Sequence, residues 1–314
     1  MKLSPDHLKK RISKRARDKQ DQTLKEQGWY DPSARSDMDA VFIGGCGRSG
    51  TTLFKELLNR HSRCACGPET SLYGLPFNID NIAAPWDIDR SHLETFVDRS
   101  SNLVEFADLF ATEFLTNECK KRWVEKTPNN VRAIDRLLTW YPNARFIHVI
   151  RDGRDVVCSL RKHPRERVVN GKIVPVDSNN PVERSAMRWL NDTSMGLAFQ
   201  NHPRCIEVRY EAFVTDPAAE MARVCDFIGE DFEQGMLNPD SDSSVNAQRS
   251  GQNMNNAGAA RPITPKSIGR WKTDLKETER NAFIDVAGEL LIALGYANDH
   301  TWASDQGRSR GTSS

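Results

Sequence analysis

Glycines, hydroxyl side chains and one arginine are concentrated between positions 44 and 52, which read Gly-Gly-Cys-Gly-Arg-Ser-Gly-Thr-Thr. An apolar run at 40–43 precedes this segment and an amphipathic stretch follows it, so we expect a turn from a strand into a helix. Backbone N–H groups in such a turn, together with the helix N-terminus, converge on one point and bind a phosphate there. Further donors and a fixed charge come from the side chains. The candidate binding residues are Gly47, Arg48, Ser49, Gly50, Thr51 and Thr52. A tight turn without a ligand is the alternative.

One missing lysine distinguishes this loop from that of ATP and GTP enzymes. Gly45 and Gly50 have the spacing of the nucleotide triphosphatase motif, and Thr52 occupies its Ser or Thr position. Position 51, however, is Thr where that motif has the lysine that reaches the β- and γ-phosphates. The positive charge lies earlier, at Arg48. A kinase or other phosphotransferase that uses ATP or GTP with Mg²⁺ therefore remains the alternative function, and the missing lysine argues against it.

The loop resembles that of the sulfotransferase family, which reads Arg or Lys, Ser, Gly, Thr, Thr and binds the 5'-phosphosulfate of 3'-phosphoadenosine 5'-phosphosulfate (PAPS). A second match follows the apolar run 145–150, where Arg151 and Ser159 are similar to the family's 3'-phosphate motif. Arg151 comes directly after a predicted strand, and ligands of open α/β sheets bind at strand C-termini. Taken alone, Arg151 is also compatible with an ion pair to Asp152 or Asp155 at a solvated helix end.

Three further segments resemble nucleotide-binding motifs of the family. Residues 267–272 are similar to its C-terminal Gly-Arg-Trp-Lys motif, position 210 to a tyrosine at a strand end, and positions 249–250 to a loop motif of the tyrosylprotein branch. The matches run from 41 to 272 in the expected order. The nucleotide-binding residues that they imply are Tyr210, Ser250, Arg270 and Lys272, and Arg249 belongs to the same loop motif as Ser250.

A polar segment from 239 to 265 contains almost no large apolar residues and is predicted to be a long loop. Loops of this length within a domain are usually disordered or functional lids. Because pieces of the implied nucleotide site lie in or beside it, we interpret it as a lid.

The resemblance also implies the residues that act on the sulfuryl group. This reaction needs a base for the acceptor hydroxyl and positive charge beside the sulfate and the leaving phosphate. Lys126 resembles the family lysine in that second role, which Arg48 would share. The cytosolic branch has a catalytic histidine where this chain has Pro128, whereas Glu69 resembles the catalytic glutamate of the tyrosylprotein branch. The alternatives are a solvated charge for Lys126 and a helix cap or surface carboxylate for Glu69.

Departures from the tyrosylprotein branch concern its disulfides and its substrate. Secretory members pair the cysteines that match Cys66 and Cys205 with positions that are Val124 and Leu197 here, so neither bridge can form. An arginine that helps to hold acidic peptides is replaced by Ser71. The acceptor therefore stays open among a small alcohol or phenol, a carbohydrate and a peptide tyrosine, and a reducing compartment is expected.

The elements that must position these residues alternate between strands and helices. Short apolar runs predict strands at 40–43, 123–124, 145–150 and 205–209. Helices are predicted at 51–60, 131–140, 154–160, 183–200, 217–228 and 276–294. This βαβ alternation predicts an α/β fold, a single domain with a P-loop-type central parallel sheet flanked by helices.

Composition limits the partners. The chain has 314 residues, 44 Lys and Arg against 43 Asp and Glu, and no apolar stretch of membrane-spanning length. We therefore expect no nucleic-acid partner, no stable membrane insertion and a cytoplasmic location, with a homodimer left open. Seven scattered cysteines predict free thiols, and no ligand set for a metal is evident. The predicted divisions are a flexible basic arm at 1–38, a sulfotransferase domain at 39–300 and a disordered tail at 301–314.

Overall fold

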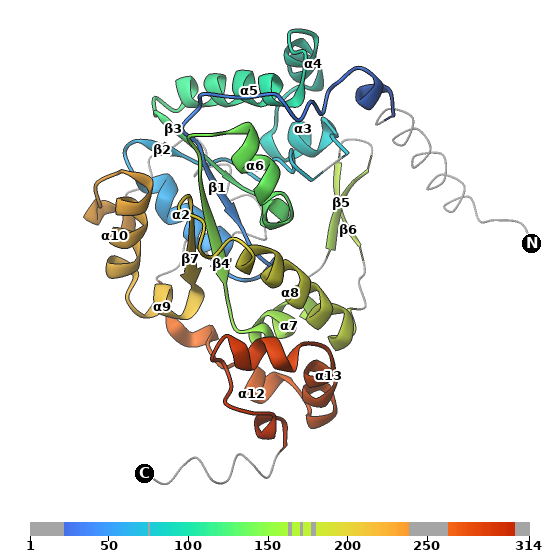
Figure 1. Cartoon of the computed structure of the whole chain (residues 1–314), viewed down its shortest axis with the longest axis vertical. Helices are drawn as coiled ribbons and strands as arrows, with labels where there is room; N and C mark the ends of the chain where they lie inside the picture. The colour runs from blue at the N-terminus through green and yellow to red at the C-terminus, as the bar shows by residue number, and fades with distance from the viewer. Residues whose placement is uncertain are drawn as a thin grey trace, which may run out of the picture.

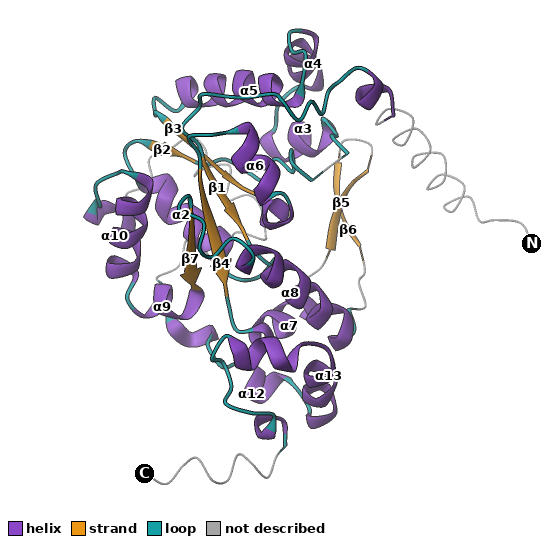
Figure 2. Cartoon of the chain, viewed as in Figure 1, coloured by secondary structure: helices purple, strands orange, loops and turns teal. Residues whose placement is uncertain are grey.

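A five-stranded parallel sheet forms the centre of the chain in the computed structural model (Figure 1 and Figure 2). The structure describes residues 22–74, 76–162, 165–169, 172–176, 180–238 and 263–304. The strands are β1 (Val41–Gly44), β2 (Cys64–Ala65), β3 (Arg122–Lys126), β4 (Arg145–Ile150) and β7 (Cys205–Arg209). Their order is β2-β3-β1-β4-β7, and each neighbouring pair is parallel. The predicted α/β class with a P-loop-type sheet is confirmed.

The chain changes direction across the sheet at β1. After β1, helix α2 (Thr51–Arg60) leads to β2 at one edge, and β3 then returns to pair with β1. β4 pairs with the other side of β1, and β7 lies beyond it. Such a switch point opens a crevice at the C-terminal ends of the strands, where ligands of open α/β sheets bind.

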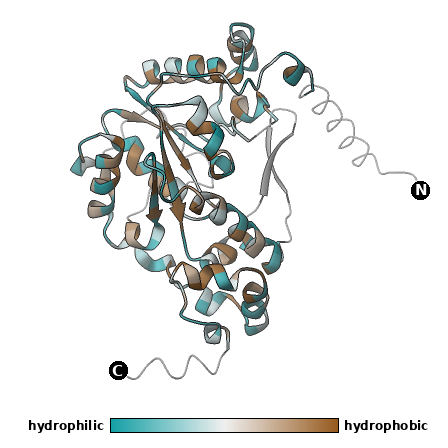
Figure 3. Ribbon diagram, in the orientation of Figure 1, coloured by the Kyte–Doolittle hydropathy of each residue, from teal (hydrophilic) through white to brown (hydrophobic). Residues whose placement is uncertain are grey.

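Alternating side chains of β1 enter two cores on opposite faces of the sheet. Val41 and Ile43 belong to a cluster with the apolar side chains of α2 and of the helices α9 (Tyr210–Thr215) and α10 (Pro217–Ile228). Phe42 belongs to the cluster on the other face. Because both faces are covered, β1 is continuously apolar, and brown dominates the central strands in Figure 3.

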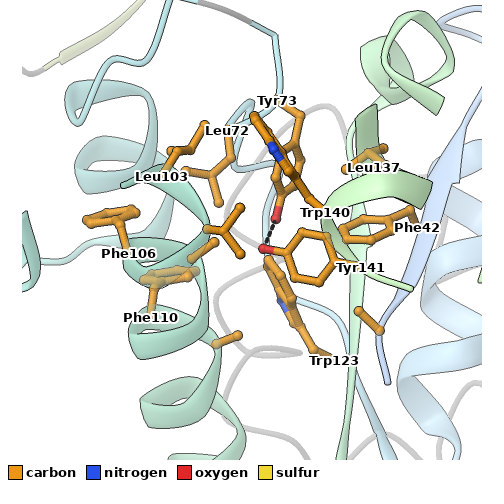
Figure 4. Close-up of a cluster of buried hydrophobic side chains, with 14 of the residues drawn as sticks. Phe42, Leu72, Tyr73, Leu103, Phe106, Phe110, Trp123, Leu137, Trp140 and Tyr141 are labelled. Atoms are coloured by element: carbon orange, nitrogen blue, oxygen red, sulfur yellow. Dashed lines mark hydrogen bonds between the residues drawn. The ribbon is translucent and has the colours of Figure 1, made fainter. Parts of the chain in front are cut away.

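Aromatic rings fill the second core, which Figure 4 shows in close-up. The ring of Phe42 makes edge contacts with Tyr73, Trp123 and Tyr141 at centroid distances of 5.4, 6.0 and 5.1 Å. The Tyr73 hydroxyl donates to that of Tyr141 at 2.9 Å, so both buried phenols are satisfied. Four helices contribute to this layer: α3 (Asp80–Trp86), α4 (Arg90–Asp98), α5 (Leu103–Asn117) and α6 (Ile134–Trp140).

A third cluster joins the C-terminal part of the chain to the end of β4. Trp189 lies at its centre, against Phe283 and over Gly153, where an added Cβ would lie 2.5 Å from the indole. The helices here are α7 (Gly153–Lys162), α8 (Val182–Leu197), α12 (Trp271–Asp274) and α13 (Glu277–Ala293). A separate antiparallel hairpin consists of β5 (Arg165–Val169) and β6 (Lys172–Val176), and short 3-10 turns are η1 (Pro128–Arg132), η2 (Gln234–Leu237), η5 (Pro265–Ser267) and η6 (Thr301–Ala303).

Residues near both ends of the described chain pack against the rest of it. Within 22–38, which the sequence analysis assigned to a basic arm, Leu24 and Trp29 are buried, and the N–H of Leu103 donates to the Trp29 carbonyl at 2.9 Å. Near the other end, Trp302 packs against Trp271 with centroids 5.1 Å apart. Most of the predicted lid, 239–262, lies outside the described residues. None of the described helices is long and apolar enough to span a bilayer.

Candidate active site

The C-terminal ends of four strands bring the predicted site residues to one edge of the sheet. The register pairs Ile43 with Lys126 across β1 and β3, and Ile150 with Arg209 across β4 and β7. The residues that follow each strand therefore emerge side by side. Lys126 ends β3, Arg151 follows β4, and the 44–50 loop follows β1 between them.

The loop between β1 and α2 has the conformation of an anion site. Gly50 caps α2 at φ 94°, and a Cβ there would lie 2.3 Å from the ring of Tyr210, so only glycine fits. Thr51 and Thr52 open the helix, whose first turn carries no acidic residue. The Ser49 hydroxyl is buried and has no hydrogen-bond partner among the described residues. A buried donor without a partner beside a helix N-terminus fits a bound anion.

Arg48 points toward helix α7. Its backbone is left-handed at φ 77°, a strained conformation for a residue with a side chain. Its Nε donates to the Ser159 hydroxyl at 3.1 Å, which joins the two motifs across 111 residues. Burial and the neighbouring charge of Arg151 lower the pKa of Arg48, and Arg270 adds to this effect. The charges of Arg48, Arg151 and Arg270 thus lie near one another, and such a group of guanidinium cations favours a bound phosphate.

Arg151 is held by backbone groups and an aromatic ring. Its Nη1 donates to the Arg48 carbonyl at 3.2 Å and its Nη2 to the Ser267 carbonyl at 2.8 Å. Its guanidinium lies 4.2 Å from the ring centroid of Tyr210, whose hydroxyl makes a 2.6 Å hydrogen bond to Ser267 Oγ. Arg151 is buried, and its Nε has no partner among the described residues. A solvated ion pair at a helix end therefore does not describe this residue.

Glu69 and Lys126 lie together on the other side of β1. The ammonium of Lys126 contacts the Glu69 carboxylate and lies 3.4 Å from the Thr52 hydroxyl. The Lys126 side chain is only 4% exposed, so it is not a solvated surface charge, whereas Glu69 is 44% exposed. A buried cation and an accessible carboxylate therefore meet beside the anion-binding loop.

Some of the remaining predicted residues lie near the site, and others lie outside the described part of the chain. The Arg270 guanidinium pairs with Asp274 at 2.9 Å, and Lys272 lies on the same short helix, α12. Arg249 and Ser250 lie outside the described residues. Gly47 faces a side chain that the sequence analysis did not single out, since a Cβ at this position would lie 3.0 Å from Arg188 Nη2.

A buried carboxylate that sequence reasoning missed connects the two segments carrying Glu69 and Lys126. Glu125 accepts from the hydroxyls of Thr70 and Thr127, each at 2.7 Å, and from the amide of Asn130. Burial raises the pKa of Glu125, and these hydrogen bonds oppose that effect. Its position at the end of the predicted strand 123–124, close to Thr127, was the available signal, but its burial was not evident from the sequence.

A second carboxylate that the sequence analysis missed lies near Gly47, together with two arginines. Asp192 is completely buried and accepts from Arg132 Nε at 2.6 Å, and its other oxygen lies 3.4 Å from Arg188 Nε. The spacing of Arg188 and Asp192 by four residues on α8 was visible in the sequence. Their approach to Gly47 was not, because it depends on tertiary packing.

The fold and this edge of the sheet define a P-loop-type α/β protein whose glycine-rich loop lies between basic side chains after β4 and an ion pair of Glu69 with Lys126 at the end of β3. The family model described as "Sulfotransferase family" matches residues 40–234. The chain belongs to the sulfotransferase family, and it is a PAPS-dependent sulfotransferase that transfers a sulfuryl group to a hydroxyl acceptor. The family and function that the motifs implied are confirmed.

Relatives from distant organisms support this assignment. A putative protein-tyrosine sulfotransferase of Caenorhabditis briggsae is 29% identical over 267 residues, which cover 82% of this chain and 88% of the relative. The nodulation protein NoeE of Sinorhizobium fredii is 26% identical over 292 residues, covering 85% of this chain and 68% of NoeE. The fold is similar to the sulfotransferase domain of the Synechococcus PCC 7002 olefin synthase, with a TM-score of 0.57, 19% identity and coverage of 82% and 95%.

Proposed function

We propose that residues on the two sides of the loop between β1 and α2 have different roles. Those on the β4 side recognise the nucleotide, and those on the β3 side accept the proton of the acceptor and stabilise negative charge. The observation that carries this proposal is the meeting of Arg48, Ser159 and Arg151 on one side of β1 and of Glu69 and Lys126 on the other. PAPS supplies the activated sulfuryl group. Arg151, Ser159, Arg270 and Lys272 hold its 3'-phosphate, and the loop residues hold its 5'-phosphosulfate.

In the proposed mechanism the sulfuryl group passes directly to the acceptor. The acceptor oxygen forms a bond to sulfur as the bond from sulfur to the bridging phosphate oxygen breaks, and the acceptor proton passes to the Glu69 carboxylate. Lys126 and Arg48 stabilise the negative charge on the sulfate oxygens and on the departing phosphate. The products are a sulfate ester and 3'-phosphoadenosine 5'-phosphate (PAP), and no step in this scheme uses a metal.

The acceptor in this proposal is a hydroxyl that needs a base, in a small alcohol or phenol, a carbohydrate or a peptide tyrosine. The names of the relatives include protein-tyrosine sulfotransferases and a nodulation protein. Transfer of labelled sulfate from PAPS to pools of each acceptor class, followed by mass spectrometry, identifies the class.

The nucleotide half of the proposal is tested by thermal unfolding with PAP, AMP and ADP. A ligand that binds only the native state raises the melting temperature with its affinity, so we expect PAP to stabilise the protein most. Equal stabilisation by ADP, or a strict need for Mg²⁺, would indicate the phosphotransferase alternative instead.

The cytoplasm is the proposed location. All seven cysteines are free, and Cys66 is completely buried, where burial raises the pKa of its thiol to about 12 and makes it unreactive. Thiol titration after denaturation of protein from its native source should find seven reduced cysteines, whereas oxidised pairs would contradict a reducing compartment.

A further inference from the structure

Asp155, in the first turn of α7, connects the nucleotide side of the site to the C-terminal motif. Its side chain is fully buried. One carboxylate oxygen accepts the N–H of Gly269 at 2.8 Å, and the other accepts the N–H of Trp271 at 3.0 Å. These two amides flank Arg270. A single side chain therefore fixes the backbone on both sides of Arg270, more than 110 residues away in the sequence.

The backbone around Arg270 turns sharply at this point. Gly269 is left-handed at φ 73°, its carbonyl accepts the N–H of Lys272 at 3.1 Å, and helix α12 begins at Trp271. The guanidinium of Arg154 lies 4.0 Å from the centroid of the Trp271 ring. The turn thus presents both basic side chains, Arg270 and Lys272, from a segment anchored to α7.

The Asp155 carboxylate attracts Arg151, but it also lies beside a site that is proposed to bind an anion. Asp155 lies 4.0 Å from Arg151 Nη2, beside the proposed 3'-phosphate site, where a negative charge opposes binding of another anion. Burial and Asp152 raise the pKa of Asp155, and its two backbone hydrogen bonds oppose that rise. An apolar side chain would leave both backbone N–H groups without their acceptors, and asparagine would offer them only one oxygen. We therefore attribute the function of Asp155 to its hydrogen bonds with the backbone of Gly269 and Trp271.

We propose that Asp155 is a positioning residue for recognition of the 3'-phosphate, because it docks segment 267–272 so that Arg270 and Lys272 are in place to bind this group. The inference rests on the proposed function, in which those two side chains bind the 3'-phosphate. Asp155 itself does not touch the nucleotide in this proposal. It acts through the backbone amides of Gly269 and Trp271.

Titration calorimetry with PAP and with AMP tests the proposal in the Asp155→Asn variant. Asparagine offers only one acceptor oxygen to the two amides, so we expect PAP to bind about tenfold more weakly and AMP to bind as in the unaltered protein. Asp108→Asn is the control. Asp108 lies on α5, and burial raises the pKa of its partly buried carboxylate to about 6, but it does not contact this segment. It should leave both affinities unchanged.

A double-mutant cycle separates positioning from general stability. In a chain that already carries Arg270→Ala and Lys272→Ala, Asp155→Asn should produce no further loss of PAP affinity. An equal loss of PAP and AMP affinity in Asp155→Asn, or an undiminished effect in that background, would overturn the proposal.

Hydrogen exchange tests the docking of segment 267–272 in the unaltered protein without nucleotide, so the result does not depend on whether a variant folds. The amides of Gly269 and Trp271 should be protected because they donate to a buried carboxylate. Exchange at the rate of an unprotected amide would show that the segment is not docked, and it would overturn the proposal. Failure of the proposed function is seen separately, since the unaltered protein would then bind PAP and AMP equally well.

Discussion

The ammonium group of Lys126 contacts the carboxylate of Glu69 across the ends of β3 and β2. While this contact lasts, a Glu69 carboxylate oxygen is occupied by the Lys126 ammonium. The sulfuryl group of the donor is itself anionic and would compete with Glu69 for Lys126. We therefore expect donor binding to free Glu69 for the acceptor proton.

Removal of the proposed base should affect turnover and spare nucleotide binding. We expect Glu69→Ala to lower kcat by about 10²-fold or more, the usual scale for loss of a general base, and Glu69→Gln to be almost as impaired. Lys126→Ala should also lower kcat, through lost charge stabilisation. PAP affinity serves as the control. Unaltered turnover in Glu69→Gln together with an impaired Lys126→Ala would assign Glu69 a structural role only.

Loss of Arg151 should abolish discrimination of the 3'-phosphate. In Arg151→Ala a charge-assisted contact to phosphate disappears while the 44–50 loop remains, so PAP and AMP should stabilise the variant equally. Thermal unfolding with each nucleotide measures this. A retained preference for PAP would place the recognition elsewhere, with Arg270 and Lys272 as the next candidates.

Glu125 should matter for turnover although it is buried away from substrate. Its carboxylate accepts from Thr70, which follows Glu69, and from Thr127, which follows Lys126. Glu125→Gln replaces one acceptor oxygen by an amide donor, so we expect a loss of about tenfold in kcat. In a Glu69→Gln background this loss should vanish if Glu125 acts by positioning Glu69. Additive losses in kinetic assays would argue for an independent effect.

Gly50 should tolerate no side chain. In Gly50→Ala a methyl group would lie 2.3 Å from the ring of Tyr210, at a φ of 94° that alanine rarely adopts. We expect weaker binding of every adenine nucleotide, PAP and AMP alike, because the loop and the ring cannot both keep their places. Gly229→Ala is a matched control, since Gly229 also has a positive φ but no atom lies near its missing Cβ. Equal affinities in the two variants would contradict this prediction.

Acid should destabilise the protein through His148. This side chain lies on β4 against Gly196, and burial lowers its pKa from 6.5 to about 4. The unfolded chain therefore binds the proton first, so the free energy of unfolding is lost progressively as the pH falls from 6.5 to 4. The loss amounts to about 3 kcal/mol. Urea unfolding of the unaltered protein and of His148→Gln should diverge over this range, and parallel curves would contradict the assignment.

The central strands and the loop were predictable because their signals are local. The apolar run 145–150 and the helix at 51–60 match β4 and α2 at both ends, and the glycines of 44–50 mark the turn between them. Helices α3, α4 and α5 were not predicted. Their sequence carries no recognisable motif, and they pack into the same core as Phe42, from a strand far away in the sequence.

The site was predictable where a short motif marks it, and not where contacts join distant segments. The residue types at Arg48, Lys126 and Arg151 could be recognised in the sequence. The direction of Arg48 toward Ser159 could not, nor could the burial of Glu125, because both depend on how the strands are ordered in the sheet.

The position of β1 between β3 and β4 has a consequence for how such an enzyme diversifies. In the proposed function, Arg151 and Ser159 bind the nucleotide from the β4 side of β1, whereas Glu69 and Lys126 act on the acceptor and the sulfuryl group from the β3 side. We therefore expect changes in the segments near Glu69 to alter the choice of acceptor more than the recognition of the donor. The same donor-binding residues are thus compatible with many acceptors, and a new substrate requires changes on only one side of β1.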